Sequence, residues 1–222
     1  MKNEKCNTIA ILDSGIGGIS ILRQLIRKYK AGNYIYFADN EFMPYGNKDK
    51  AFVKDRVNEI VEFLKIRYKA NKIIIACNTA STCLYGTTDK TIEILTFDKS
   101  KTFLTTELTK KNLIGYNVIS SKDLATKIEK NIFNKIKLNK IIKETVQELS
   151  LDKLQELTLG CTHYELVADI FKKYCKNTQI ELNSSYLINK LNLKTNNELK
   201  VTIIMSNKTK KYENKLIKLL NI

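Results

Sequence analysis

Two short segments of the chain share one design, in which an apolar run ends in a cysteine followed by hydrogen-bonding side chains. Residues 73–76 (IIIA) lead into Cys77-Asn78-Thr79, and residues 157–160 (LTLG) lead into Cys161-Thr162-His163. Such runs are typical of buried strands, and open α/β sheets carry their reactive groups where these strands end. The repetition predicts an α/β protein in which two thiols, one from each half, face each other across a small substrate.

The length of the chain sets how many domains it can form. Its 222 residues are enough for one large domain or for two of about 100 residues each. The two cysteine motifs favour two domains. The sequence has no apolar stretch of 18 residues and begins with polar residues, so we expect neither a membrane span nor a secretory leader, and a cytoplasmic protein.

The cysteines form an odd set without a Cys-x-x-Cys pair. There are five, at positions 6, 77, 83, 161 and 175. A disulfide framework or a zinc site is therefore not expected, and reduced thiols are. We expect Cys6, Cys83 and Cys175 to be small buried hydrophobes. Cys77 and Cys161 have polar neighbours that a plain core would not need, so they are the candidates for chemistry.

The formal net charge of +15 raises the question of a nucleic-acid partner. The lysines are spread over many segments, and no basic block interleaved with aromatic residues is present. We therefore expect most of them on solvated faces and predict no specific nucleic-acid binding. The alternative that this charge attracts an anionic partner stays open. The same positive potential would also attract a small anionic substrate.

Apolar runs alternate with helical patterns along much of the chain, which is typical of parallel βαβ units with ligand-binding loops at the carboxyl ends of the strands. Strands are predicted at residues 8–12, 34–38, 73–76, 92–97, 113–119, 157–159, 180–182 and 201–205. Helices are predicted through residues 21–26 and at residues 51–68, 138–149, 166–174 and 212–220.

Four motifs in this order are similar to those of glutamate racemases, in the cofactor-independent aspartate/glutamate racemase superfamily. They are Asp13-Ser14-Gly15-Ile16-Gly17-Gly18, Pro44-Tyr45-Gly46, Cys77-Asn78-Thr79-Ala80-Ser81 and Gly160-Cys161-Thr162-His163-Tyr164. The only proline and the only histidine of the chain, Pro44 and His163, both lie inside these motifs. The resemblance is strong over residues 8–85 and 151–174 and weaker elsewhere.

The resemblance implies two similar parallel-sheet α/β domains with the active site in the cleft between them. The first would comprise residues 1–95 and 183–222 and carry Asp13 and Cys77, and the second would comprise residues 96–182 and carry Cys161 and His163. The implied activity is interconversion of L- and D-glutamate, which supplies D-glutamate for peptidoglycan, cell wall biogenesis and cell shape. No cofactor and no metal is implied. The implied partner is glutamate, a homodimer is left open, and no membrane partner is expected.

The implied site follows from the chemistry of racemisation, which removes the Cα proton from one face and returns a proton to the other. No motif for a pyridoxal-phosphate lysine or a metal is visible, so two side chains must transfer the protons. The resemblance makes Cys77 and Cys161 these bases, with Asp13 assisting the first thiol and His163 the second. The residues implied to bind substrate are Asp13, Ser14, Pro44, Tyr45, Gly46, Asn78, Thr79, Thr162 and His163.

The second half departs from the family pattern. The threonine-rich substrate loop expected after residues 113–115 is missing, so that only Ser120 or Ser121 could substitute. The stretch resembling Val-Pro-Leu-Val-Glu is not recognisable between residues 132 and 144, Asn183-Ser184 replaces Asp-Ser, and Glu165 replaces a proline.

These departures leave alternatives open. The chain could be an aspartate or other amino-acid racemase of the same superfamily, or a catalytically impaired amino-acid-binding relative. A further alternative is that Gly15-x-Gly17 belongs to a dinucleotide-binding loop, with Asp39 as the acid that such a loop needs.

Overall fold

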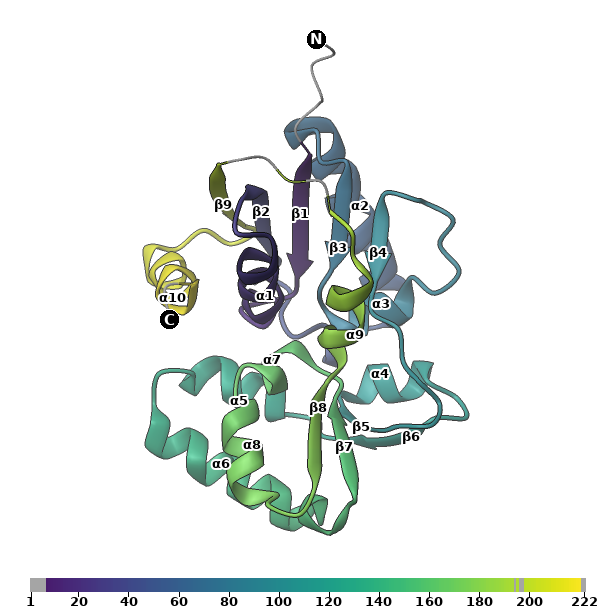
Figure 1. Cartoon of the computed structure of the whole chain (residues 1–222), viewed down its shortest axis with the longest axis vertical. Helices are drawn as coiled ribbons and strands as arrows, with labels where there is room; N and C mark the ends of the chain where they lie inside the picture. The colour runs from purple at the N-terminus through teal and green to yellow at the C-terminus, as the bar shows by residue number, and fades with distance from the viewer. Residues whose placement is uncertain (1–6, 194, 196–197, 221–222) are drawn as a thin grey trace.

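The structure is a computed structural model that describes residues 7–193, 195 and 198–220. The described strands form two parallel sheets, which lie one above the other in Figure 1. The first sheet has the order β4-β3-β1-β2-β9 and the second the order β6-β5-β7-β8. An α/β fold with parallel sheets, as the sequence predicts, is confirmed.

The first sheet contains β1 (Thr8–Asp13), β2 (Gly32–Ala38), β3 (Lys72–Ile75), β4 (Ile92–Ile94) and β9 (Leu199–Met205). Helices cover both of its faces, because side chains on a strand point alternately to opposite sides. Ile9 and Ile11 join the core that contains α1 (Ile19–Tyr29), α9 (Asn183–Lys190) and α10 (Lys210–Leu220). Ala10 and Leu12 join the core on the other side, with α2 (Lys50–Tyr68) and α3 (Asn78–Cys83).

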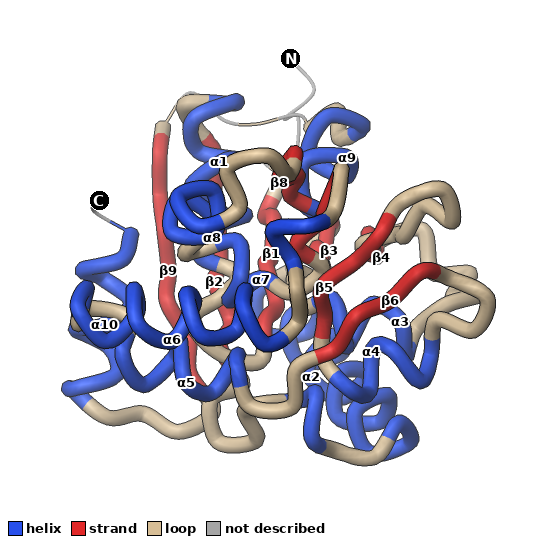
Figure 2. Tube along the Cα trace, turned by 90° about the horizontal axis from the view of Figure 1, so that it is seen from below, coloured by secondary structure: helices blue, strands red, loops and turns tan. Residues whose placement is uncertain are grey.

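The second sheet contains β5 (Thr102–Thr105), β6 (Asn117–Ser120), β7 (Glu156–Leu159) and β8 (Gln179–Leu182). One face packs against α5 (Leu124–Asn131), α6 (Lys135–Glu148) and α8 (Ala168–Tyr174), which lie together in Figure 2. The other face carries a much smaller buried cluster of Phe97, Phe103 and Leu113. The second sheet is thus well covered on one face only.

The shorter elements complete the path of the chain. They are η1 (Tyr45–Asn47), α4 (Glu107–Asn112), η2 (Leu151–Lys153) and α7 (Thr162–Glu165). The chain leaves the first sheet after Ile94 and returns after Leu182 through α9, and β9 then pairs with the outer edge of β2. The predicted domain boundaries lie in these two crossings, and the division into two domains stays a prediction.

The predicted strand at residues 113–119 is wrong in position. Leu113 caps the end of α4, and Gly115 has a φ of +80° in the turn that follows, so the strand begins only at Asn117. The strand at residues 92–97 is shorter than predicted and ends at Ile94. The central strand β5 was not predicted at all, because it is only four residues long and has threonine at both ends.

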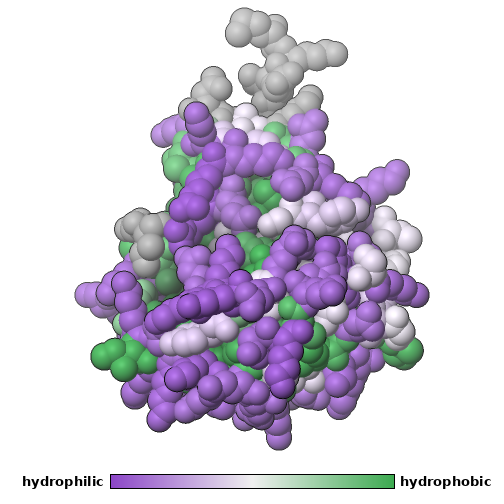
Figure 3. Space-filling model, turned by 60° about the horizontal axis from the view of Figure 1, so that its bottom comes forward, coloured by the Kyte–Doolittle hydropathy of each residue, from purple (hydrophilic) through white to green (hydrophobic). Residues whose placement is uncertain are grey.

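The surface is consistent with the charge pattern of the sequence. Hydrophilic side chains dominate the face shown in Figure 3, with hydrophobic ones in small separate areas. No helix in the described part of the chain is both long and apolar enough to cross a membrane.

Candidate active site

Three strand ends meet where the two sheets face each other. Asp13 ends β1, Cys77 follows β3 as the N-cap of α3, and Cys161 follows β7 as the N-cap of α7. The carboxyl ends of parallel strands lie at one edge of a sheet, so the topology brings these residues to the junction seen in Figure 1. Cys77 and Cys161 are close enough for the charge of one to act on the other.

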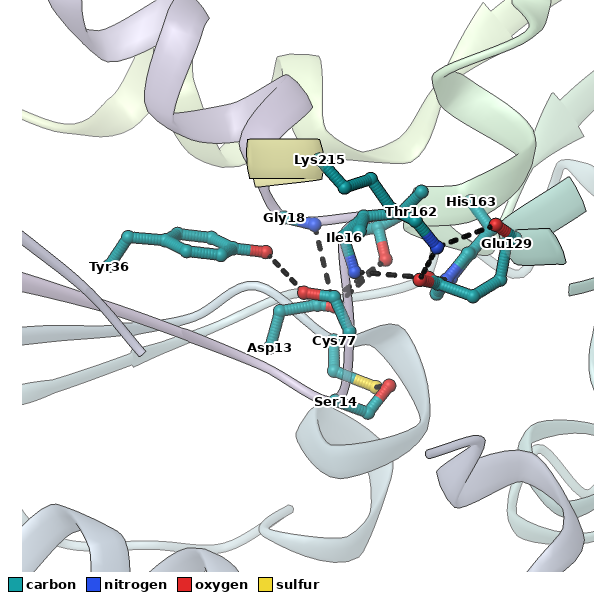
Figure 4. Close-up of polar contacts among 11 residues, drawn as sticks. Asp13, Ser14, Ile16, Gly18, Tyr36, Cys77, Glu129, Thr162, His163 and Lys215 are labelled. Carbon is teal, nitrogen blue, oxygen red and sulfur yellow. Dashed lines mark hydrogen bonds and ion pairs between the residues drawn. The ribbon is translucent and has the colours of Figure 1, made fainter. Parts of the chain in front are cut away.

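The glycine loop after β1 packs directly against the second half of the protein. A Cβ atom on Gly17 would lie 2.3 Å from Thr162 Oγ1. Asp13 Oδ2 accepts hydrogen bonds from Gly18 N at 3.1 Å and from Thr162 Oγ1 at 3.1 Å, as Figure 4 shows. The glycines therefore permit close contact between the two halves, which explains them without a bound phosphate.

Asp39, the acid that a dinucleotide-binding loop would need, is engaged elsewhere. It is fully buried and accepts hydrogen bonds from Tyr45 Oη at 2.6 Å and from Arg56 Nε at 3.0 Å and Nη2 at 2.8 Å. These bonds hold η1, which Pro44 caps at its N-terminus. Gly46 then lies against Thr106, where an added Cβ would come within 2.7 Å of the Thr106 side chain. The motif at residues 44–46 is thus a second contact between the halves.

Cys77 lies among neutral hydroxyls and a carboxyl group. Its Sγ donates to Ser14 Oγ at 3.8 Å. Burial and, next, the charge of Asp13 raise the pKa of the Cys77 thiol well above its ordinary value. Burial likewise raises the pKa of Asp13, although the charge of His163 opposes it. Cys77 therefore keeps its proton near neutral pH and is suited to donate one.

Asn78, next to Cys77, has a hydrogen-bond partner within the described part of the chain for only one of the two polar atoms of its side-chain amide. Its Oδ1 accepts from Asn183 Nδ2 at 2.7 Å. Its Nδ2 is buried and finds no hydrogen-bond partner among the described residues. A buried donor without a partner is costly, so this atom is available for a polar ligand at the junction.

Cys161 lies beside a buried ion pair. His163 hydrogen-bonds to Cys161, and its Nε2 is 2.8 Å from Glu129 Oε2. Burial alone would lower the pKa of His163, but the hydrogen bonds to Cys161 and Glu129 outweigh it and hold the pKa above its ordinary value. Glu129 Oε2 also accepts from Ile16 N at 3.2 Å, and Lys215 Nζ lies 3.2 Å from Oε1 (Figure 4). These hydrogen bonds therefore favour the protonated form of the imidazole beside the second thiol.

Glu129 is a candidate functional residue that the sequence analysis missed. It lies in α5, ahead of the stretch at residues 132–144 where a glutamate was sought. The lysine-rich sequence around Glu129 is typical of a helix face that contacts solvent. The available signal was the spacing, because Glu129 follows buried Ala125 by four residues and so belongs to the same face as the core.

A cluster of buried threonine hydroxyls lies at the end of β5, against Thr79 of α3. Thr79 Oγ1 lies 3.0 Å from Thr106 Oγ1 and 2.9 Å from Thr109 Oγ1, and these two hydroxyls are 2.9 Å apart. A threonine-rich loop is expected from the sequence after residues 113–115, where only Ser120 or Ser121 could substitute. The structure places β5 ahead of those residues, so Thr106 and Thr109 are further candidates for that loop.

Glu165 is a buried acid on α7, at the position where the family pattern has proline. It accepts hydrogen bonds from Ser184 N at 3.0 Å and from Ser184 Oγ at 2.6 Å, which ties α7 to the start of α9. Burial raises its pKa to about 7.

No cluster of three or more His, Cys, Asp or Glu side chains suited to a metal ion occurs within residues 7–193, 195 and 198–220.

The described fold and site define an α/β protein with a pair of thiols at the junction of two parallel sheets, and known proteins share this fold. A crystal structure of a glutamate racemase isoform from Bacillus anthracis superposes with a TM-score of 0.82 at 24% identity, covering 99% of this chain and 96% of that one. The Escherichia coli glutamate racemase, in complex with L-glutamate and an activator, gives a TM-score of 0.80 at 21% identity, covering 97% and 94%.

Sequence similarity is closer for another relative. The glutamate racemase of Buchnera aphidicola subsp. Schizaphis graminum is 35% identical over 187 residues, which are 71% of this chain and 72% of the relative. No protein-family model matches the chain. From the identity and coverage of this relative, the chain belongs to the glutamate racemase family.

Proposed function

We propose that this protein is a glutamate racemase, a cofactor-independent isomerase that interconverts L- and D-glutamate with two thiols. Membership of the family supports this activity. The observation that carries the proposal is the pair of cysteines at matching positions, each capping a helix that follows a central strand of its own sheet. A racemase needs one base on each side of the substrate, and this pair supplies them from opposite halves.

The proposed reaction has two proton transfers. The thiolate on one side removes the Cα proton of glutamate and becomes a thiol, leaving a carbanion stabilised by the adjacent carboxylate. The thiol on the other side gives its proton to the opposite face of Cα and becomes a thiolate. The product is the other enantiomer, and the two cysteines have exchanged protonation states.

Asp13 and His163 are proposed to assist one thiol each. His163 hydrogen-bonds to Cys161, and a positively charged imidazole stabilises a thiolate. Asp13 acts on Cys77, whose proton it favours through its charge. Glu129 is proposed to orient His163 and keep it charged through the contact at 2.8 Å.

The substrate is proposed to bind between the two thiols through groups from both halves. The unpartnered Asn78 Nδ2 would donate to a carboxylate, and the hydroxyls of Thr79 and Thr106 extend this polar wall. Ser14, Pro44, Tyr45, Gly46 and Thr162 complete the proposed set, several of them through backbone groups. A nearby opening is lined by Gly46, Asn47, Leu108, Glu107 and three lysines, Lys48, Lys111 and Lys122. An excess of positive charge there favours an anionic substrate.

An aspartate racemase and an impaired amino-acid-binding protein are the competing functions. Glutamate and aspartate differ by one methylene, which is worth about 1–3 kcal/mol in an apolar pocket. The retained threonines at the end of β5 weigh against loss of the substrate loop.

Incubation with L- or D-glutamate in deuterated water tests the proposal, with Cα deuterium read by NMR. Deuterium and the opposite enantiomer should appear from either substrate, and more slowly from aspartate. Faster exchange with aspartate would reassign the substrate. Binding of glutamate without exchange would identify an impaired relative.

The wider setting is also proposed. The D-glutamate produced would serve peptidoglycan synthesis. The four described cysteines are free thiols, which suits the reducing cytoplasm where that synthesis begins. A homodimer stays a proposal that light scattering of the purified protein would test.

A further inference from the structure

A lysine of α10 reaches from the first half of the protein to a buried carboxylate in the second. α10 packs through Leu216 and Leu219 in the core beneath the first sheet. From the same helix, Lys215 Nζ lies 3.2 Å from Glu129 Oε1 and donates to the Glu129 backbone oxygen at 3.1 Å. Glu129 belongs to α5, whose buried side chains belong to the core of the second sheet.

The two oxygens of Glu129 have different partners. Oε1 contacts Lys215, whereas Oε2 lies 2.8 Å from His163 Nε2 and accepts from Ile16 N at 3.2 Å. The carboxylate is only 3% exposed, so it cannot exchange these contacts for water. Figure 4 shows it clamped between Lys215 and His163. A rotation of the carboxylate that breaks one contact would disturb the others.

We propose that Lys215 is a positioning residue for proton transfer at Cys161, because it fixes the Glu129 carboxylate that in turn fixes His163. This inference rests on the proposed racemase function. Lys215 itself does not touch the thiol. Its effect passes through two hydrogen-bonded side chains, and it makes α10 a part of the catalytic apparatus.

The charges around Glu129 support this role. Burial would raise the pKa of Glu129, but His163 and, after it, the charge of Lys215 lower the pKa below its ordinary value. The titratable groups that face Glu129 are Asp13 after β1, Tyr36 on β2, His163 on α7, and Tyr212 and Lys215 on α10. Only His163 and Lys215 in this set are basic. Without Lys215, Glu129 should therefore take up a proton at a higher pH.

Activity measurements on purified variants form the first test. Lys215→Met should lower kcat by about 10- to 100-fold, as for other groups that orient a reactive residue, with KM changed less than about twofold. Lys215→Arg, which keeps the charge, should restore most of the rate. Lys211→Met, on an exposed position of the same helix, is the matched control and should behave as wild type. A Lys215→Met enzyme with wild-type kcat would overturn the inference.

The chain contains a single histidine, so NMR of its imidazole reports on His163 without any need for activity. Protonation of Glu129 should appear as an acid inflection in the His163 ¹⁵N shifts. This inflection should move to higher pH in Lys215→Met and stay in place in Lys215→Arg and Lys211→Met. If Lys215→Met fails to fold, Lys215→Gln carries the same test with a neutral polar group.

The two tests separate the inference from the proposed function. An unchanged inflection in a folded variant without the lysine charge would refute the role of Lys215 even in an active racemase. A wild-type protein that exchanges no Cα proton would refute the racemase proposal, whereas the NMR titration would still decide whether Lys215 controls the Glu129–His163 pair.

Discussion

The two cysteines occupy equivalent places in the two halves but have very different surroundings. Cys77 contacts a serine hydroxyl and lies near the buried carboxyl group of Asp13. Cys161 is bonded to His163, which continues into Glu129 and Lys215. One thiol lies beside a carboxyl group that favours its proton, and the other is hydrogen-bonded to an imidazole.

This difference suits a reaction that needs an acid and a base at the same time. Two thiols in identical surroundings would ionise at the same pH. The state with one thiol and one thiolate would then compete with the states in which both are protonated or both are ionised. The unequal surroundings seen here give the two thiols different partners for these two roles. The following experiments test whether the functional roles are as unequal as the structure suggests.

The largest effect is expected from removing either thiol. Cys77→Ser and Cys161→Ser should each lower kcat/KM for racemisation by about 10⁴-fold in both directions, because a hydroxyl is a far weaker base than a thiolate. Each variant keeps one base, so slow exchange of the Cα proton in deuterated water should survive with one enantiomer only. The surviving enantiomer should differ between the variants. Near wild-type racemisation by either one would remove the basis of the comparison.

A smaller effect, about 100-fold, is expected from removing the helper of each thiol. His163→Asn should slow proton transfer at Cys161, and Asp13→Asn should slow it at Cys77. Racemisation has an equilibrium constant of one, so kcat/KM falls equally in both directions and cannot reveal the asymmetry. Primary isotope effects with α-deuterated L- and D-glutamate can, since each substrate reports deprotonation of its own face. If the two variants shifted the isotope effects alike, each thiol would not have its own helper.

Glu165 gives the Cys161 side a further property, a dependence of stability on pH. Its pKa of about 7 in the folded protein exceeds the ordinary value, so folding retains a proton that the unfolded chain releases. Stability from this source is therefore complete at acid pH and decreases as the pH rises from about 4.5 to 7. Glu165→Gln should remove the decrease, a gain on the order of 3 kcal/mol at pH 8 relative to wild type.

Urea unfolding of wild type and Glu165→Gln at pH 4, 6 and 8 would measure this gain. The difference between the two proteins should grow with pH and then level off. A constant difference would mean that Glu165 has the same pKa in the folded and the unfolded protein. Glu181→Gln, a partly exposed glutamate on β8, is a suitable control because its charge is not buried.

The smallest effect is expected for a cysteine outside the junction. Cys175 is 1% exposed within the core of the second sheet. Cys175→Ala should leave kcat/KM within about twofold and cost on the order of 1 kcal/mol of stability through the lost packing. A large loss of activity with normal stability would show that a third thiol takes part and would weaken the two-thiol comparison.

Sequence reasoning predicted the first half of the molecule better than the second. The strands at residues 8–12, 34–38 and 73–76 consist of apolar residues buried on both faces, so their pattern is unambiguous. In the second sheet β5 is four residues long and one face is thinly covered, so a short run bounded by threonines carries little signal. Overlooking that strand also displaced the search for the threonine loop.

The candidate site divides in the same way. Residues that follow directly on apolar strands, such as Asp13, Cys77 and Cys161, could be picked out from local sequence alone. Glu129 offered only its spacing from Ala125 and Lys215 offered no signal, because their significance arises from contacts between helices far apart in the chain. A lysine in an amphipathic helix looks like any other solvated lysine until the tertiary structure supplies its partner.

The outer edge of β2 pairs with β9, a strand that lies more than 150 residues further along the chain. During synthesis, β1, β2 and β3 leave the ribosome long before β9 and α10 exist. Until then, the β2 edge of the nascent first sheet is unpaired, and the apolar face that α10 covers is partly exposed. The residues that close this edge belong to the same segment that brings Lys215 to Glu129. Completion of the sheet and assembly of the proposed proton-transfer apparatus thus become a single late event, because partly made chains carry both cysteines before Lys215 can reach Glu129.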